Sequence, residues 1–213
     1  MFPFPFSFLS GAAPDVPVEQ IANAEAMSFN GTDQYVNIPN NSVFNLGTSY
    51  TISGWFNVTS YVANMGYISF DSSTRGWFLF HQSTNLALYD GTAVRTLKAS
   101  FTPTNAWNSY IITYDGTDLI FYLNGQQNST QAVTSNLQTN GNDGQIGNQQ
   151  FAAGRYFNGK IDEVAIFNTA LSGPKIQQIY DATAVVDGVP QTANLFTGGL
   201  DSSLVYWNRM GDS

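Results

Sequence analysis

The sequence predicts an all-β protein: a two-sheet antiparallel jelly-roll sandwich with one short C-terminal helix and extended N- and C-terminal arms. Short runs that alternate apolar and polar residues recur along the chain, as expected for half-buried strands. Asn-Gly and Asp-Gly dipeptides, which tolerate positive φ and favour tight hairpins, separate many of these runs. With 213 residues, the chain is long enough for one large β domain with its own core.

The composition divides the chain into three parts. Residues 1–22 form an aromatic, proline-rich arm, residues 23–182 the jelly-roll domain, and residues 183–213 a tail. Proline fixes extended geometry in the arm, so its apolar side chains cannot form a core alone. They either pack on the chain's own sandwich or anchor it to a partner protein. The candidate anchors are Phe2, Phe4, Phe6, Phe8 and Leu9.

The tail is likewise too apolar for a solvated linker, with Leu204, Val205, Tyr206 and Trp207 in succession. Docking onto the chain's own domain and binding in trans both fit this composition. Trp207 is therefore a further candidate partner anchor.

Ten strand-like runs fill the central part. In 50–58, Ile52, Phe56 and Val58 share one face, and Thr51, Ser53 and Asn57 share the other, which is the half-buried antiparallel pattern. Both faces of 119–123 are apolar, which favours a central strand. The runs are 26–29, 34–38, 50–58, 66–70, 76–81, 86–89, 107–114, 119–123, 144–147 and 159–167.

A strand followed by one short helix is predicted over 157–181. Alternation places Asp162, Val164 and Ile166 on one side of the strand, the side expected to face inward. Ser172 can cap the helix, and Pro174 falls in its first turn, where its missing N–H costs nothing.

These segments together resemble the laminin-G-like, concanavalin A-like jelly-roll domains. The resemblance rests on MSFNGTDQYVNIP, YTISGWFNV, WNSYIITYDGTDLIFYLNGQ, IGNQ and YFNGKIDEVAIFNTALSGPKIQQIYD, and covers about residues 25–182. It implies two packed antiparallel sheets of six or seven strands each. The family includes carbohydrate-binding, adhesion and virion surface modules, so it is informative on fold and much less so on function. Lys175 stands where the helix start of such domains usually has Glu.

The resemblance also implies a structural calcium ion beside the closing strand, although no cofactor is required. Asp162, the side chain of Asn30 and the carbonyl of Gly31 are the candidate ligands, because Ca²⁺ binds hard oxygens. Alternatively, Asp162 accepts backbone N–H groups at a turn.

Three residues are candidate glycan contacts: Trp77 as a stacking platform, with His81 and Tyr89 beside it. The alternative is that they are ordinary strand residues. His81 is the only histidine, and no nucleophilic triad can be assembled around it.

Composition excludes several other functions. The net charge of −8 and seven scattered basic residues argue against a nucleic-acid surface. No apolar run reaches the roughly 20 residues of a membrane span, and the N-terminal segment lacks the basic region of a recognisable signal peptide. Only three Glu are present, without the E-x-D-x-x-E arrangement of jelly-roll glucanases, so we expect no enzyme.

Two functions remain. The first is a non-enzymatic structural protein on a virus particle, such as a bacteriophage capsid decoration or fibre protein. Such a protein would be homo-oligomeric, anchored to a shell or neighbouring subunit by its arms, and located on the virion surface or otherwise extracellular. The alternative is a carbohydrate-binding or adhesion module that recognises cell-surface glycans.

Overall fold

The computed structural model describes residues 16–71, 76–83, 85–96, 105–183, 185–186 and 189–212. The candidate arm anchors from Phe2 to Leu9 lie outside these residues, so their role stays a prediction.

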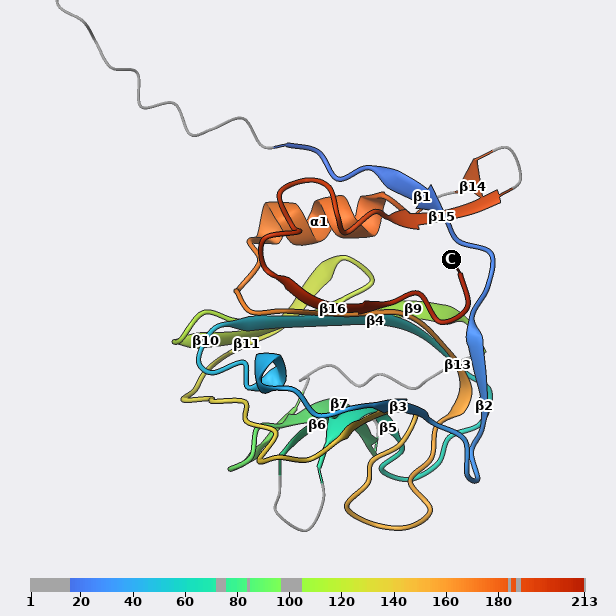
Figure 1. Ribbon diagram of the computed structural model, residues 1–213, viewed down its shortest axis with the longest axis vertical. Helices are drawn as coiled ribbons and strands as arrows, with labels where there is room; N and C mark the ends of the chain where they lie inside the picture. Colours follow the sequence, from blue (N-terminus) through green and yellow to red (C-terminus); the bar gives the residue numbers. More distant parts are fainter. Residues whose placement is uncertain are drawn as a thin grey trace, which may run out of the picture.

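Two antiparallel sheets form the sandwich (Figure 1). The first contains β2 (Met27–Asn30), β4 (Tyr50–Val58), β9 (Trp107–Tyr114), β10 (Asp118–Leu123), β11 (Gln126–Ala132), β13 (Asn158–Phe167) and β16 (Leu204–Asn208). The second contains β3 (Val36–Ile38), β5 (Gly66–Phe70), β6 (Trp77–Gln82), β7 (Asn85–Tyr89), β8 (Val94–Thr96) and β12 (Gly144–Ile146). Their orders are β11–β10–β9–β4–β13–β16, with β2 also on β13, and β3–β12–β5–β6–β7–β8. The predicted jelly roll of six or seven strands per sheet is confirmed.

The core between the two sheets is rich in aromatic rings. Trp77, Tyr50, Tyr67, Tyr110 and Phe56 are all fully buried there. Rings pack edge-on or tilted, as between Phe56 and Tyr67, whose centroids are 4.9 Å apart at 63°. A short 3₁₀ turn, η1 (Ser42–Phe44), adds Phe44 against Phe70 at 4.7 Å.

A β-bulge in β13 changes which side chains face the core. The β13–β4 register shifts between Asp162 and Ala165, and Glu163 adopts a positive φ of 51°. As a result Ile161 and Val164 both face the core, whereas Asp162 is on the outer face of the sheet, opposite Trp55. The prediction that Asp162 shares a face with Val164 and Ile166 is therefore wrong, because a bulge breaks the period of two.

β2 and β16 share the same edge of β13, end to end. Residues Asn158–Ile161 pair with β2, and Val164–Phe167 pair with β16. The bulge lies where one partner strand gives way to the other. The segment that leads into β2 and the segment that follows β16 therefore meet beside Asp162 and Glu163.

The N-terminal and C-terminal parts of the described chain pair with each other. A third sheet has the order β1–β15–β14, made of β1 (Gln20–Ala22), β14 (Val185–Val186) and β15 (Val189–Ala193). Together with the helix α1 (Gly173–Asp181), it forms an additional layer on the outer face of the seven-stranded sheet (Figure 1). The end of the proposed arm thus has a partner strand, which the sequence analysis did not expect.

The helix begins as predicted. Ser172 is its N-cap, its Oγ accepts a hydrogen bond from Lys175 N at 3.4 Å, and Pro174 lies in the first turn. Ile176 and Ile179 are buried against the sheet with Phe167 and Leu195. This apolar contact fixes the helix on the outer face of the sheet.

The predicted strands agree with the observed ones to within one or two residues, but β1, β8, β11, β14, β15 and β16 were not expected. β11 reads QQNSTQA, which is too polar to be recognised as a strand. It forms because it lies at the sheet edge and pairs with β10 over its whole length. The Asn-Gly dipeptide at residues 158–159 does not form a hairpin turn, because it lies at the start of β13.

The helix of the described chain is too short and too polar to cross a membrane.

Candidate functional site

A groove of about 460 Å³ opens between the outer face of the seven-stranded sheet and the additional layer. It is lined by Asn23, Ala24, Glu25, Ala26, Trp55, Trp107, Lys160, Asp162, Thr183, Gln191 and Thr192. The lining comes from four places: the sheet, the segment before β2, the end of α1, and β15. The tertiary fold therefore assembles this groove from residues that are far apart in the sequence.

Strand register determines the floor of the groove. Asn57 on β4 lies opposite Trp107 on β9 and opposite Lys160 on β13. In the next row of the same face, Trp55 lies opposite Ser109 and Asp162. The two indoles are thus diagonal neighbours, about 7–8 Å apart at their backbones.

The two floor tryptophans differ in exposure. Trp107 is 41 % exposed, whereas Trp55 is half-buried and stacks on Tyr180 of α1 with ring centroids 5.9 Å apart at 10°. Tyr180 is itself confined, since a Cβ on Gly125 would lie 2.4 Å from its Cδ1. The stacked Tyr180 ring therefore holds Trp55 in place, whereas Trp107 presents its indole to solvent.

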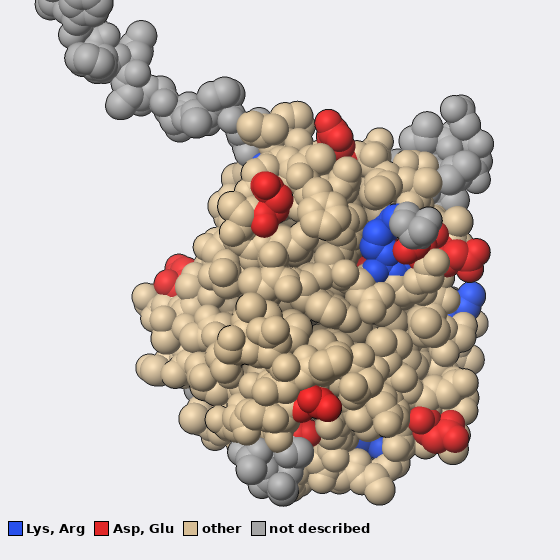
Figure 2. All heavy atoms as spheres, viewed as in Figure 1, with Lys and Arg blue, Asp and Glu red and all other residues tan. Residues whose placement is uncertain are grey.

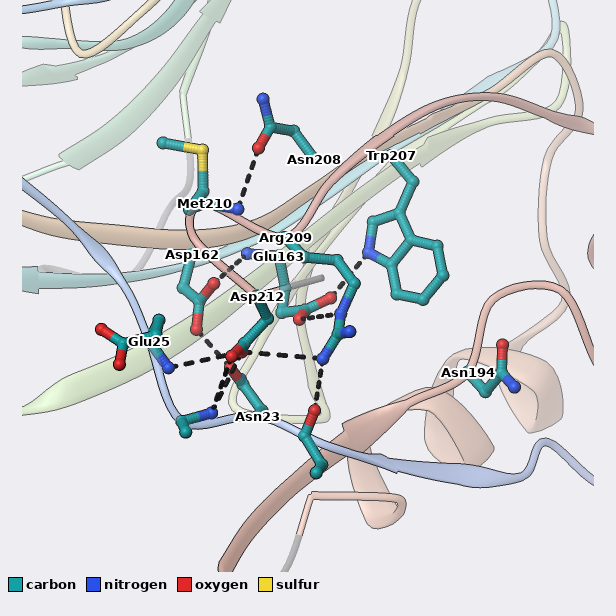
Figure 3. Close-up of polar contacts among 12 residues, drawn as sticks. Asn23, Glu25, Asp162, Glu163, Asn194, Trp207, Asn208, Arg209, Met210 and Asp212 are labelled. Carbon is teal, nitrogen blue, oxygen red and sulfur yellow. Dashed lines mark hydrogen bonds and ion pairs between the residues drawn. The ribbon is translucent and has the colours of Figure 1, made fainter.

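Two adjacent carboxyl groups lie at the bulge (Figure 3). Asp162 Oδ2 accepts from Asn23 Nδ2 at 2.9 Å, and Asp162 Oδ1 accepts from Glu163 N at 2.8 Å. Glu163 Oε2 accepts from Trp207 Nε1 at 2.6 Å, and Glu163 Oε1 accepts from Arg209 Nε at 3.4 Å. Burial raises the pKa of Asp162 to about 6 and the pKa of Glu163 to about 7, despite these hydrogen bonds.

The C-terminal segment fastens one wall of the groove. Asp212 carboxylate oxygens accept from Ala24 N at 3.0 Å and Glu25 N at 3.3 Å. Arg209 donates to the carbonyl of Ala22 and lies 3.6 Å from the Asp212 carboxylate. We call Arg209–Asp212 the clasp, because it joins the end of the described chain to the segment before β2 (Figure 3).

Trp77, the predicted stacking platform, is fully buried and packs on Phe70 at 4.9 Å in the core. His81 is also fully buried, on the same inward face, with its Nδ1 3.1 Å from Tyr67 Oη. Tyr89 is half-buried and stacks on Phe78 at 4.9 Å. The structure therefore does not bring these three residues together as a sugar-binding face, because the side chains of Trp77 and His81 on β6 point into the core between the sheets.

The predicted calcium ligands do not fit a shared site. Asn30 is opposite Asn158, at the far end of the β2–β13 pairing from Asp162. Its Oδ1 accepts from Thr32 N and Asp33 N at 2.9 and 3.2 Å in a local turn. Within the described ranges, no group of three or more His, Cys, Asp or Glu is placed to hold a metal ion.

Trp207, a candidate partner anchor, is instead engaged within its own chain. Besides its bond to Glu163, its ring contacts Phe196 edge-on at 5.2 Å. β16 pairs with β13, so this part of the tail docks in cis.

The sequence analysis did not select Trp107 and Trp55, although a usable signal was present. In the alternation of β9, Trp107 shares a face with Ser109 and Thr113. The buried Tyr110, Ile112 and Tyr114 are on the other face. Trp55 similarly shares the polar face of β4 with Ser53 and Asn57. A tryptophan on the polar face of a half-buried strand marks an outward-facing ring.

Figure 2 shows that charged side chains are sparse over one whole side of the molecule. Basic and acidic groups are juxtaposed beside the C-terminal end of the chain, where the clasp lies. The groove is therefore next to the main charged feature of this face.

Solved structures of similar fold include the following three domains. Domain 4 of AbnA, a GH43 extracellular arabinanase from Geobacillus stearothermophilus in complex with arabinotriose, is 17% identical with a TM-score of 0.58, over 71% of this chain and 74% of that chain. The CBM40 of the Ruminococcus gnavus IT-sialidase, bound to α2,3 sialyllactose, is 13% identical with a TM-score of 0.59, over 77% of this chain and 99% of that one. The binding domain of Paraclostridial Mosquitocidal Protein 1 is 15% identical with a TM-score of 0.60, over 79% of this chain and 46% of that chain.

At these identities the likeness is one of fold. No curated protein matches the sequence. The family model Laminin_G_3, described as the concanavalin A-like lectin/glucanases superfamily, matches residues 30–177, which is more than half of the chain. The chain belongs to the concanavalin A-like lectin/glucanase superfamily.

Proposed function

We propose that this protein is a non-enzymatic carbohydrate-binding module, and that sugar binds in the groove on the outer face of the seven-stranded sheet. The observation that carries the proposal is Trp107, a 41 % exposed indole on the floor of a 460 Å³ groove. Binding sites typically combine apolar rings with a few placed polar groups, and a pyranose has both an apolar C–H face and hydroxyls around its rim.

Polar groups for the hydroxyls surround the indoles. Asn23, Gln191 and Thr192 line the walls, and Lys160 and Asp162 lie on the floor. These groups come from strands β13 and β15 or from the segment held by the clasp. The supporting neighbours include two sugar-bound structures, of arabinotriose and of sialyllactose.

The test is a glycan array followed by calorimetric titration of the best ligand. Trp107→Ala is expected to weaken binding at least tenfold, which corresponds to about 1.4 kcal/mol. Phe151→Ala is the matched control, because Phe151 is 44 % exposed and is not part of the groove lining. Full binding by the Trp107 variant, or no binding of the native chain to any glycan, would refute the proposal.

The absence of catalysis is part of the proposal. Glycoside hydrolysis uses two carboxyl groups on either side of the scissile bond. The carboxylates in the groove lining are Glu25 and Asp162, and both oxygens of Asp162 already accept hydrogen bonds. A polysaccharide hydrolysis assay is expected to show no turnover, and turnover lost on Asp162→Asn would contradict this.

The virion-surface hypothesis, with its homo-oligomeric assembly, stays a prediction that rests on the apolar arm. It would be tested by deleting residues 1–10, which should abolish particle association and leave the sandwich folded. Structural calcium also stays a prediction, tested by comparing thermal unfolding with Ca²⁺ and with a chelator.

A further inference from the structure

We infer that the groove prefers sugars that carry a protonated amine over acidic sugars. This inference rests on the proposed function and adds the charge class of the ligand. It is carried by the charges in and behind the groove and by the two indoles on its floor.

The ionisable groups around the groove are mostly acidic. Glu25 and Asp162 line it, with Lys160 as the cation among the lining residues. Directly behind Asp162 lie Glu163 and Asp212, with Arg209 between them. A carboxylate on a sugar would be repelled by this set, while an ammonium group would be attracted to it.

The aromatic floor favours the same ligand. An indole face attracts a cation through its quadrupole, and tryptophan does so best among the aromatic side chains. Trp107 is exposed and its diagonal neighbour Trp55 is opposite Asp162. Of the two rings, Trp55 is therefore the one beside the Asp162 carboxyl group, whereas the cross-strand row of Trp107 contains Lys160.

Asn23 holds the carboxyl group of Asp162 at the wall of the groove. Asn23 Oδ1 is buried and finds no hydrogen-bond partner among the described residues, while Asn23 Nδ2 donates to Asp162. Because Asn23 Oδ1 has almost no exposed surface, a ligand in the groove does not reach this oxygen. An ammonium group carries three donors and would interact with the carboxyl groups that line the groove, those of Glu25 and Asp162.

The experiment compares three sets of oligosaccharides by calorimetry at low ionic strength: glucosamine oligomers, N-acetylglucosamine oligomers of the same linkage, and oligouronates. We expect the glucosamine oligomers to bind roughly tenfold more tightly than their acetylated counterparts, and the oligouronates to bind most weakly. Added salt should reduce the preference. Asp162→Asn and Glu25→Gln should each reduce the ratio of the two affinities.

The outcomes separate this inference from the proposed function. Equal affinity for the glucosamine and acetylated oligomers, or tighter binding of oligouronates, overturns the charge preference and leaves the carbohydrate-binding proposal standing. A preference that survives in the Asp162→Asn, Glu25→Gln double variant also overturns it. No binding of any oligosaccharide, here or on the glycan array, refutes both.

Discussion

β6 and β9 each begin with a tryptophan, one in each sheet, and the two side chains have opposite environments. Trp77 is fully buried between the sheets, whereas Trp107 is 41 % exposed on the groove floor. In β9, the residues on the face opposite to Trp107 form the core side, so its orientation follows from alternation. In β6 both faces are apolar and buried, and alternation cannot tell inside from outside. The polarity of the strand, more than the residue type, decides whether a ring is available to a ligand.

The outer faces of the two sheets differ in the same way. On the six-stranded sheet, Phe78, Phe80 and Tyr89 pack on one another. On the seven-stranded sheet, buried carboxyl groups and an additional layer create the groove. A binding site on this fold thus depends on what covers the sheet.

The largest expected effect comes from truncating the buried ring. Trp77→Ala should lower the free energy of unfolding by about 3–5 kcal/mol, because it leaves a large cavity in the core. Trp107→Ala should change it by less than about 0.5 kcal/mol, because the ring is half in water. Chemical denaturation measures both, and similar losses for the two variants would remove the distinction.

The next effect is a pH dependence of the stability, caused by two carboxyl groups at the bulge of the seven-stranded sheet. Asp162 and Glu163 have folded-state pKa values raised to about 6 and 7. Their contribution to stability is present below the unfolded pKa, near 4, and is lost as the pH rises through 6 to 7. As the pH rises, the ionisation of each group should lower the free energy of unfolding by on the order of 2 kcal/mol.

Denaturation at pH 4.5 and pH 8 tests this effect. Asp162→Asn and Glu163→Gln should each flatten the change, because the amide cannot ionise. Glu25→Gln, which alters an exposed carboxyl group, serves as the control. An unchanged profile in both amide variants would show that these carboxyl groups do not titrate as described.

A smaller effect is expected at the clasp. Asp212→Ala removes the acceptor for Ala24 N and Glu25 N and should destabilise the protein by about 1–2 kcal/mol. It should also weaken glycan binding, because the wall of the groove loses its support. Asp201→Ala, which removes an exposed charge elsewhere, is the control. Hydrogen exchange at residues 22–26 that stays as slow as in the native protein would contradict the assigned role.

The smallest effect concerns the helix that covers the sheet. Ser172→Ala should cost about 0.5–1 kcal/mol, at the lower end for an N-cap because the hydrogen bond is long, at 3.4 Å. Ser202→Ala is a matched exposed control. Thermal unfolding of the two variants gives the difference, and equal midpoints would show that the cap contributes nothing.

By itself the sequence determined the sandwich, most of its strands and the helix, because alternation, turn dipeptides and a capping serine are local signals. β4, β5 and β9 have the predicted bounds. The resemblance to concanavalin A-like domains predicted the family, which the family model confirms.

Only the tertiary structure decided where the candidate site lies. The bulge at Glu163 reverses the face of Asp162, and no local pattern announces a single inserted residue. The groove also needs β1 against β15 and the clasp against residues 22–25, contacts that join the two ends of the described chain. Such pairings depend on how the whole sandwich closes, because their partners are separated by more than 150 residues.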